Sequence, residues 1–261
     1  MTDHVIVTFE DGVQTLTLNR PDKKNALTPE MYAALADGIE RAETDPQIRV
    51  TLFQANGDAF TAGNDLGDFA KAGSAPVTQS NEKTPVARFL ENLATAEKPL
   101  IAAVNGLAVG VGVTMLLHCD LVYAGASSTY QMPFVNLGLV PEAGSTLLLP
   151  RLIGLQKAAD LFLTGKKISA DKAEAMGIVA EVFADADLRA EALARAKTLA
   201  SKAPNAVKIT KALIKSDDRK AVLEQQRKEG EHFGAQLRSA EVKEAISAFF
   251  EKRPADFSKL S

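Results

Sequence analysis

The chain of 261 residues has little of what disulfide scaffolds and most metal sites need: it contains one cysteine, Cys119, and three histidines. A single cysteine cannot form an intrachain disulfide and excludes a multi-cysteine metal site. Three scattered histidines do not suggest a zinc triad, so we expect no bound metal. A strong net charge is also absent, since 30 Lys and Arg against 33 Asp and Glu leave −3. This balance argues against a nucleic acid or an anionic membrane as partner.

Charge is scarcest in the middle of the chain. Residues 99–150 contain two charged side chains, Asp120 and Glu142, where the overall charged fraction of 24% predicts about 12. The uncharged run 99–119 is long enough to raise the question of a membrane span. An Asn-Gly turn and two later glycines interrupt it, which predicts a buried strand followed by a buried helix. We therefore expect this segment in a protein core, with no membrane partner.

The order of the predicted elements indicates an α/β protein with stacked sheets. Strands over 5–9 and 13–18 flank Asp11-Gly12, which is a hairpin signal, and Thr28-Pro29 is a helix start. Further strands and helices alternate up to about residue 185, with a polar loop predicted over 73–85. Beyond that point the pattern is helical, with helices predicted over 186–202, 205–215, 218–237 and 240–252.

The two ends of the chain carry weaker signals. The last predicted helix has an apolar stripe that includes Phe249 and Phe250. This stripe packs either onto the protein's own core or against another subunit, and the sequence leaves both open. The first residues show neither the basic start nor the apolar stretch of a secretory signal, so we expect a cytoplasmic protein.

Two glycine-containing turns carry candidate chemistry. In the segment 59–66, Ala62-Gly63 allows a tight bend with exposed backbone N–H groups. The segment 105–112 leads into a helix, and the N–H groups of its first turn, including that of Val111, have no partner within the helix. If the two turns face each other, they form a two-donor oxyanion hole.

A third segment, 136–145, contains the single carboxylate Glu142, which follows a proline and has apolar neighbours. A glutamate in the first turn of a helix often only complements the helix dipole. Because two donor-bearing turns precede it in the chain, Glu142 becomes a candidate acid/base.

These segments make the chain similar to the crotonase superfamily, also called the enoyl-CoA hydratase/isomerase family. The resemblance covers nearly the whole chain and rests on five stretches: Asn19–Ala26, Phe60–Leu66, Pro99–Ala124, Leu163–Ala170 and Ala175–Val179. It implies an α/β fold, a crotonase-type spiral of ββα units that makes two stacked sheets, with a helical C-terminal region. It also implies a homotrimer or a hexamer, which is a dimer of trimers. We therefore divide the chain into a spiral core, 1–200, with the CoA-thioester and catalytic site, and a helical trimerisation region, 201–261.

The resemblance also supplies the ligand, an acyl-CoA thioester, in which coenzyme A is part of the substrate, so no cofactor is implied. The N–H groups of Ala62 and Val111 would hold the thioester oxygen, and Glu142 would be the acid/base. The positions that match CoA contacts are Ala62, Gly63, Asn64 and Asp65 on the pantetheine path, Lys23 or Lys24 at the phosphates, and Phe249 and Lys252 at the adenine end, from a neighbouring subunit. Leu66 and Gly110 are further candidate contacts to the substrate. Phe134, Leu137 and Leu139 are candidate walls of the acyl site, and a core role for each stays open.

The chain departs from typical hydratases, which carry glutamates at the positions of Thr114 and Phe134. Neither side chain here can relay a proton from water, so hydration of the usual kind is not expected. The segment around Glu142 is instead similar to the peroxisomal-type Δ3,Δ2-enoyl-CoA isomerases, in which this glutamate is the acid/base. We therefore expect conversion of 3-enoyl-CoA to 2-trans-enoyl-CoA. The alternatives are an enoyl-CoA hydratase, a ring-opening isomerase of phenylacetyl-CoA breakdown and, in another class, a non-catalytic acyl-CoA binder.

Overall fold

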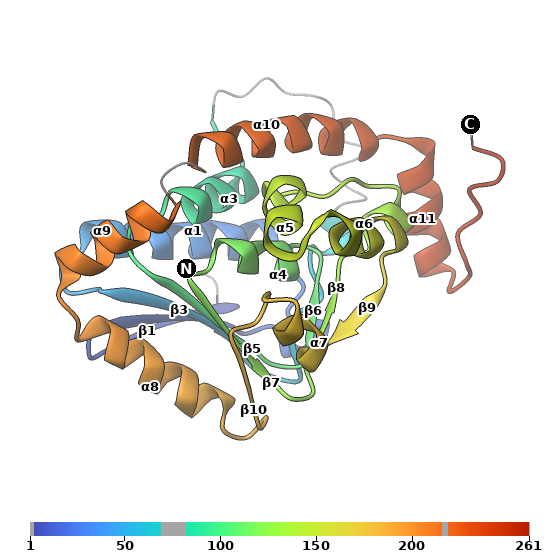
Figure 1. Cartoon of the computed structure of the whole chain (residues 1–261). Coiled ribbons are helices and arrows are strands. Elements are labelled where there is room, and N and C mark those ends of the chain that lie inside the picture. The colour runs from blue at the N-terminus through green and yellow to red at the C-terminus, as the bar shows by residue number, and fades with distance from the viewer. Residues whose placement is uncertain (1–2, 69–81, 216–218, 261) are drawn as a thin grey trace.

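The computed structural model describes residues 3–68, 82–215 and 219–260 and consists of two sheets with helices around them (Figure 1). The larger sheet has the strand order β1 (Val5–Glu10), β2 (Val13–Leu18), β3 (Val50–Ala55), β5 (Leu100–Val104), β7 (Leu121–Gly125) and β10 (Glu181–Phe183). β1 and β2 form the predicted antiparallel hairpin, and the other neighbours pair in parallel. Asp11 and Gly12 have φ angles of 49° and 79°, as a two-residue hairpin turn requires.

The smaller sheet explains how the chain winds. It contains, in order, β4 (Ala59–Thr61), β6 (Leu107–Val109), β8 (Thr129–Gln131) and β9 (Lys167–Ser169). β4 follows β3, β6 follows β5 and β8 follows β7, so the chain passes from the larger sheet to the smaller one three times. After β4 and β6 the chain reaches the helices α3 (Pro85–Thr95) and α4 (Val111–Thr114). This repeated ββα unit confirms the predicted spiral with two stacked sheets.

Most helix predictions are confirmed. α1 (Pro29–Thr44) begins at the Thr28-Pro29 signal, where the Met31 N–H donates to the Thr28 hydroxyl at 3.4 Å. The predicted C-terminal helices correspond to α8 (Leu188–Ala200), α9 (Pro204–Lys215), α10 (Arg219–Gln236) and α11 (Ala240–Phe250). The other helices are α5 (Ser145–Ile153), α6 (Leu155–Thr164), α7 (Ala170–Ala175) and the 3-10 turns η1 (Pro21–Lys23), η2 (Met115–His118) and η3 (Val135–Leu137).

Two predictions differ from the structure or fall outside it. The helix expected over 110–118 is divided, because α4 ends at Thr114 and the chain continues as the tighter η2. Of the polar loop expected over 73–85, residues 73–81 lie outside the described part of the chain, and α3 begins at Pro85.

The charge-poor segment lies in the core, as expected, since every residue of β5 and α4 is buried. Asp120, one of its two charges, accepts the Leu100 N–H at 2.8 Å and pairs with Lys211 (2.8 Å) and Lys215 (3.1 Å). The other charge, Glu142, forms no ion pair with the described residues. Within the described ranges, no helix has both the length and the apolar character needed to cross a bilayer.

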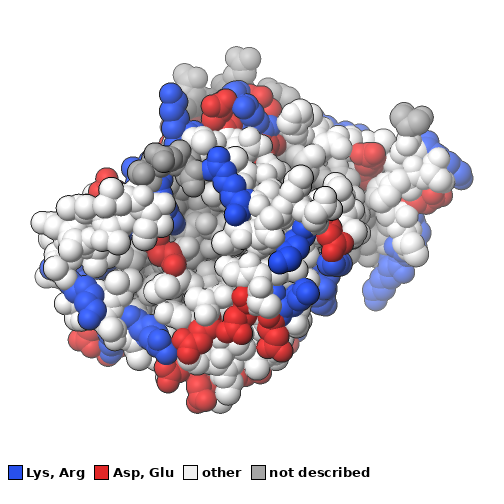
Figure 2. All heavy atoms as spheres, viewed as in Figure 1, with Lys and Arg blue, Asp and Glu red and all other residues white. Residues whose placement is uncertain are grey.

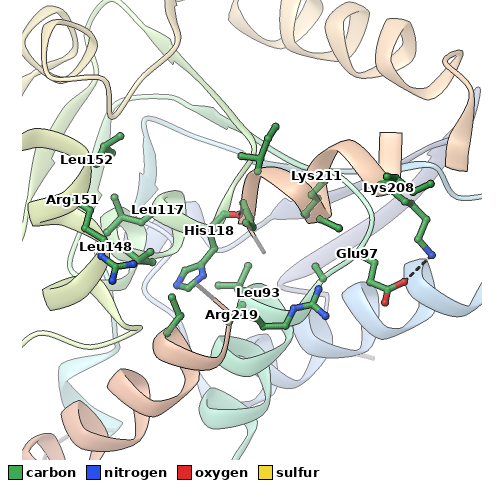
Figure 3. Close-up of a pocket in the computed structure, with 17 residues that line it drawn as sticks. Leu93, Glu97, Leu117, His118, Leu148, Arg151, Leu152, Lys208, Lys211 and Arg219 are labelled. Atoms are coloured by element: carbon green, nitrogen blue, oxygen red, sulfur yellow. Dashed lines mark hydrogen bonds and ion pairs between the residues drawn. The ribbon is translucent and has the colours of Figure 1, made fainter. Parts of the chain in front are cut away.

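A cavity of about 660 Å³ opens between α3, η2, α5, α9 and α10 (Figure 3). Its wall is largely apolar, and among the charged groups in it Lys208 pairs with Glu97 at 2.7 Å and Lys211 with Asp120 at 2.8 Å. On the face shown in Figure 2, uncharged side chains cover α9, while charges of both signs are spread over the rest. Glu142 does not line this cavity, so the candidate site is defined by its chemical groups rather than by the size of a cavity.

Candidate active site

Two backbone turns lie together because β4 and β6 are parallel neighbours. The carboxyl ends of parallel strands meet at one edge of a sheet, so the turns that follow β4 and β6 are adjacent. Small residues allow the close approach: a Cβ on Gly63 would lie 3.0 Å from the Val109 oxygen, and one on Gly112 would lie 2.4 Å from the Thr61 methyl. Gly63 also has a φ of 88°, which glycine adopts without strain.

The first turn has one N–H group that makes no hydrogen bond with the described residues. The engaged groups and their acceptors are Ala62 with the Lys24 carbonyl (2.9 Å), Gly63 with the Thr61 hydroxyl (3.0 Å) and Asp65 with the Leu27 carbonyl (3.0 Å). Asn64 forms a parallel bridge with Leu27 through the bonds of its neighbours, so its own N–H points to the opposite side. The Ala62 N–H, expected to bind an oxyanion, is therefore already engaged by the Lys24 carbonyl, and the available N–H group of this turn is that of Asn64.

The second turn supplies a matching donor. α4 begins at Val111, and the N–H groups of a first helical turn have no acceptor within the helix. The Gly110 carbonyl is already used by the N–H groups of Val113 and Thr114, at 2.9 and 3.0 Å. The Val111 N–H makes no hydrogen bond with the described part of the chain, so it is available beside the turn that contains Asn64.

Glu142 is the carboxylate of the site. It lies between η3 and α5, and the residue is 7% exposed. Burial raises the pKa of Glu142 to about 7, and the charge of Glu229 acts in the same direction. The Thr114 hydroxyl, which donates to Glu142 Oε1 at 3.3 Å, lowers this pKa and so opposes the shift. A carboxylate with a pKa near neutrality can both take up and release a proton at physiological pH.

Tyr32, on α1, contacts the first turn and lies within the electrostatic influence of Glu142. Its hydroxyl donates to the Asn64 side-chain oxygen at 2.5 Å. Its pKa is raised well above the ordinary value, first by burial and then by the charge of Glu142, so the phenol stays neutral. The ring packs at 5.6 Å from that of Phe89 on α3. The donor-bearing turn and the carboxylate are therefore parts of one site.

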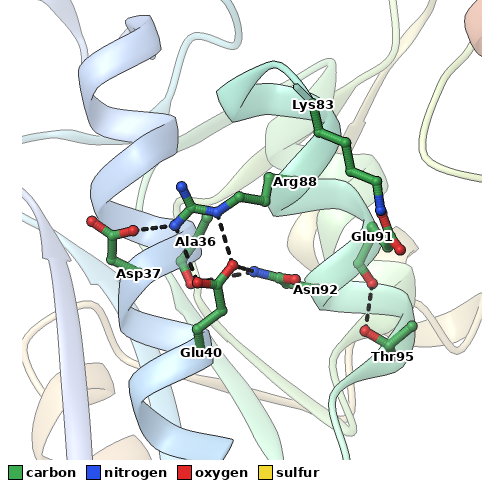
Figure 4. A network of polar contacts seen from close by, with 8 residues as sticks. All are labelled: Ala36, Asp37, Glu40, Lys83, Arg88, Glu91, Asn92 and Thr95. Atoms are coloured by element: carbon green, nitrogen blue, oxygen red, sulfur yellow. Dashed lines mark hydrogen bonds and ion pairs between the residues drawn. The ribbon is translucent and has the colours of Figure 1, made fainter. Parts of the chain in front are cut away.

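A polar network at the surface joins α1 to α3 (Figure 4). Arg88 of α3 pairs with Asp37 and, at 2.8 Å, with Glu40 of α1, and Asn92 also donates to Glu40 at 2.8 Å. An exposed ion pair stabilises a protein by only about 0.2–1 kcal/mol. One arginine that contacts two carboxylates nevertheless orients α3 on α1, and this helps hold the Tyr32 and Phe89 rings beside the site.

The backbone after Glu142 has an uncommon conformation. Ala143 and Gly144 have φ angles of 65° and 70°, and a left-handed alanine costs about 1–2 kcal/mol. The His118 ring nitrogen Nε2 lies 2.7 Å from the Ala143 carbonyl oxygen and donates to it. Burial lowers the pKa of His118 to about 4, so the ring is neutral. His118 thus holds this backbone and adds no charge.

Several predicted CoA-binding residues surround the first turn. Lys23 and Lys24 are exposed beside it, since the Lys24 carbonyl is the acceptor for Ala62, and the Lys24 ammonium pairs with Asp58. Arg20 pairs with Asp65 at 2.8 Å and lowers the pKa of this carboxyl. Gly63 and Asn64 belong to the turn, Leu66 is the first of the helical residues 66–68 that follow it, and Gly110 begins the second turn.

The other predicted residues divide between core and surface. Phe134 and Leu139 are buried in the main core, and Leu137 packs at its edge. Phe249 is exposed and Lys252 follows the end of α11. The first turn of α11, with Glu241, lies beside Gly138 at the end of η3, and Phe249 lies about 12 Å further along the helix. The fold of one chain therefore does not bring Phe249 and Lys252 to Glu142.

Three groups that shape the candidate site were not predicted from the sequence. Tyr32 follows Met31 in an ordinary amphipathic helix, and nothing in the sequence marks its contact with Asn64. Glu229 lies in α10, where charged residues occur on every turn. The acceptor for Ala62 is 38 residues earlier in the chain. Each contribution depends on a contact between segments that are distant in sequence.

Enzymes that form and stabilise an oxyanion combine a buried carboxylate with available backbone N–H groups. The sequence profile described as "Enoyl-CoA hydratase/isomerase" matches residues 8–259. The solved structure of an enoyl-CoA hydratase/isomerase from Pseudoalteromonas atlantica is 49% identical, with a TM-score of 0.92 over 98% of this chain and 100% of that one.

Two curated relatives are also similar. Enoyl-CoA delta isomerase 2 of Rattus norvegicus is 38% identical over 96% of this chain, which spans 64% of the length of the rat protein. The 1,2-epoxyphenylacetyl-CoA isomerase of Escherichia coli is 36% identical over 99% of both chains. The chain belongs to the enoyl-CoA hydratase/isomerase family and is an enzyme of the crotonase superfamily.

The raised pKa of Glu142 predicts a pH-dependent effect on stability. The folded protein holds this proton up to about pH 7, whereas an unfolded glutamate releases it near 4.5, so the contribution to stability is lost as the pH rises toward 7. Glu142→Gln removes this effect. Between pH 5.5 and 8.5, we expect the stability of the variant relative to the unaltered protein to rise by about 2 kcal/mol in urea unfolding.

The control is Glu224→Gln, which changes an exposed glutamate of α10 whose pKa is lowered by Lys228. That carboxyl is ionised in both the folded and the unfolded state above pH 5.5. The stability of Glu224→Gln relative to the unaltered protein should therefore not change with pH. An equal stability difference at both pH values for Glu142→Gln would contradict the raised pKa.

Proposed function

We propose that this enzyme converts 3-enoyl-CoA to 2-trans-enoyl-CoA, with Glu142 as the catalytic acid/base. The main support is the pairing of Glu142 with Thr114: the position that carries a glutamate in typical hydratases here holds a hydroxyl that donates to Glu142. Phe134, at the other hydratase position, is a buried apolar residue. One ionisable carboxylate therefore faces the site, and a double-bond shift needs only one.

In the proposed reaction, the Glu142 carboxylate removes a proton from C2 of the substrate. The electrons move toward the thioester oxygen and give a dienolate, and the N–H groups of Asn64 and Val111 donate to this oxygen. Protonated Glu142 then returns the proton to C4, so the double bond moves from C3–C4 to C2–C3. An oxyanion-hole donor contributes about 3–4 kcal/mol, which matters because a proton next to a thioester is weakly acidic.

The surroundings of the two turns support a CoA thioester as substrate. We propose that Lys23 and Lys24 bind phosphates, and that backbone at Gly63, Leu66 and Gly110 follows the pantetheine arm. Lys24 would exchange Asp58 for a phosphate, whereas Lys23 forms no ion pair with the described residues. For the acyl chain we propose Phe134, Leu137 and Leu139 as walls, and for the adenine end Phe249 and Lys252 of a neighbouring subunit.

Two of the three alternatives, a hydratase and a non-catalytic binder, fit the site less well. Hydration requires one group to activate water and another to protonate carbon. Among the described residues, Glu229 is the other buried glutamate, and its carboxylate is bound to the backbone at the start of α5. A ring-opening isomerase could use Glu142 in the same way, so the choice between linear and cyclic substrates depends on the assay. A non-catalytic binder would not need a buried carboxylate with a raised pKa.

The direct test offers 3-enoyl-CoA and 2-trans-enoyl-CoA separately and follows the absorbance of the conjugated thioester. We expect it to appear from the first substrate and to persist with the second. Glu142→Gln should lower kcat by about 10³-fold, because general acid–base catalysis typically contributes 10²–10⁴. Binding of a CoA ester, measured by calorimetry, should stay within about twofold. Glu224→Gln is the matched control, and equal hydration and isomerisation rates in the unaltered enzyme would argue for a hydratase.

The role of the Val111 N–H can be tested by replacing Val111 with its α-hydroxy acid, which substitutes an ester oxygen for the N–H. We expect kcat to fall by about 10²–10³-fold, the effect of losing one oxyanion donor. The same replacement at Val113 removes a helix bond to Gly110 at 2.9 Å and serves as the control. If both variants retain equal activity, Val111 is not a donor to the reacting oxygen.

We propose that the region 201–261 assembles the chain into a homotrimer or a dimer of trimers. α9 supports this, because Ile209 and Ile214 are 60% and 75% exposed in the single chain. Apolar side chains that gather on one exposed helix are typical of subunit contacts. Phe249 and Phe250, packed edge to face at 5.6 Å, form a second exposed apolar patch at the end of α11, at the other side of the molecule in Figure 1.

Light scattering after size exclusion tests this assembly. The unaltered protein should have three or six times the mass of one chain, and the double variant Ile209→Asp with Ile214→Asp should be a monomer. Ile6→Asp, at an exposed apolar residue of β1, should leave the mass unchanged. A monomeric unaltered protein would contradict the proposal, and so would a double variant that keeps the larger mass.

A further inference from the structure

Glu229 is a buried charge that the reaction described above does not use. The residue is 5% exposed and lies where α10 packs across α5 (Figure 1). Its carboxylate accepts three hydrogen bonds, from the Gly144 N–H (2.6 Å), the Thr146 N–H (2.9 Å) and the Thr146 hydroxyl (2.5 Å). Gln225, on the same helix, donates to that hydroxyl at 2.8 Å. Both carboxylate oxygens face donors, which is the arrangement of an anionic acceptor.

The bonds of Glu229 replace a missing helix cap. α5 begins after Gly144, which has no side chain that could accept from the first N–H groups of the helix. Glu229 supplies that acceptor from α10, and its negative charge lies at the positive end of the α5 dipole. Burial raises the pKa of Glu229, and the bonds from Thr146 and Gly144 act against this rise.

The cap adjoins the residue proposed to do the chemistry. Glu142 is two residues before Gly144, and the intervening Ala143 has the left-handed conformation. The turn is held at successive positions: the Glu142 side chain by Thr114, the Ala143 carbonyl by His118, and the Gly144 N–H by Glu229. The Gly144 carbonyl accepts from the N–H groups of Leu147 and Leu148, whereas the Gly144 N–H has no acceptor other than Glu229 in the described part of the chain.

We infer that Glu229 is a positioning residue for Glu142: Glu229 holds the turn that carries Glu142 and places a second negative charge beside that residue. This rests on the proposed role of Glu142 as acid/base. The titratable groups near Glu142 are Tyr32 from α1, His118 from η2 and Glu229 from α10. Tyr32 and His118 are neutral at pH 7, and no cation pairs with Glu229 among the described residues. Glu229 therefore makes Glu142 a stronger base, because a like charge disfavours its ionisation.

The test titrates Glu142 without substrate. Glutamate labelled with ¹³C at the carboxyl carbon is followed by NMR, and Glu142→Gln assigns the signal. In Glu229→Gln, which keeps the size and removes the charge, we expect the Glu142 midpoint to fall by about half a pH unit or more. We also expect kcat to fall by about tenfold and KM to change by less than about twofold, because Glu229 does not touch the substrate. Glu224→Gln, on the same helix, should change none of these values.

Glu229→Asp distinguishes the hydrogen bonds of Glu229 to the start of α5 from the effect of its charge. The shorter side chain keeps the negative charge but withdraws the carboxylate by one methylene. We expect kcat to fall several-fold while the Glu142 midpoint stays close to that of the unaltered protein. An unchanged midpoint in Glu229→Gln, or an unchanged kcat in Glu229→Asp, overturns the inference. If Glu229→Gln does not fold, Glu229→Asp decides the matter through kcat. If the unaltered protein does not isomerise 3-enoyl-CoA but the midpoint still falls in Glu229→Gln, the proposed function fails and the influence of Glu229 on Glu142 stands.

Discussion

The burial of one carboxylate without a cation is the constraint on which the site depends. Glu142 and Asp120 are the two charges of the segment 99–150, and they have opposite surroundings. Asp120 is paired with Lys211 and Lys215 and serves the junction of β5 and β7. Glu142 receives one long hydrogen bond from Thr114, and burial keeps its pKa near 7. A lysine in place of Thr114 would form an ion pair with Glu142 and lower its pKa. The Glu142 carboxylate would then be a weaker base.

The fold positions the groups around this carboxylate through a repeated connection. Each ββα unit sends a short strand into the smaller sheet, and β4 and β6 end at the same edge because they are parallel. Glycine at positions 63 and 112 then lets the two turns touch. The available N–H groups belong to the backbone, so their placement depends on strand register and helix start rather than on side-chain rotamers. This gives the site a rigidity that side-chain donors on loops rarely have.

Prediction from the sequence succeeded where the signal is local. The Asp11-Gly12 hairpin, the Thr28 cap and the buried β5 follow from neighbouring residues, and all are present. The helix start at Val111 is equally local, which is why its N–H could be proposed as a donor without a structure. Ala62 was not the available donor, because whether an N–H group is available depends on whether another residue supplies an acceptor for it. Lys24 supplies that acceptor from another loop, and no local pattern distinguishes Ala62 from Asn64.

The predicted boundary at residue 200 separates segments that are in contact in the fold. The helices beyond it were expected to serve assembly, and the exposed face of α9 supports that role. α10 has a second role, because Glu229 caps α5 and Gln226 donates to the Leu90 carbonyl of α3 at 3.0 Å. Both contacts join α10 to elements that border Glu142 or Tyr32. Removal of the helices beyond residue 200 would therefore take away the acceptor at the start of α5 and the support of α3. The spiral core and the helices that follow it thus form one folded unit, although the sequence separates them along the chain.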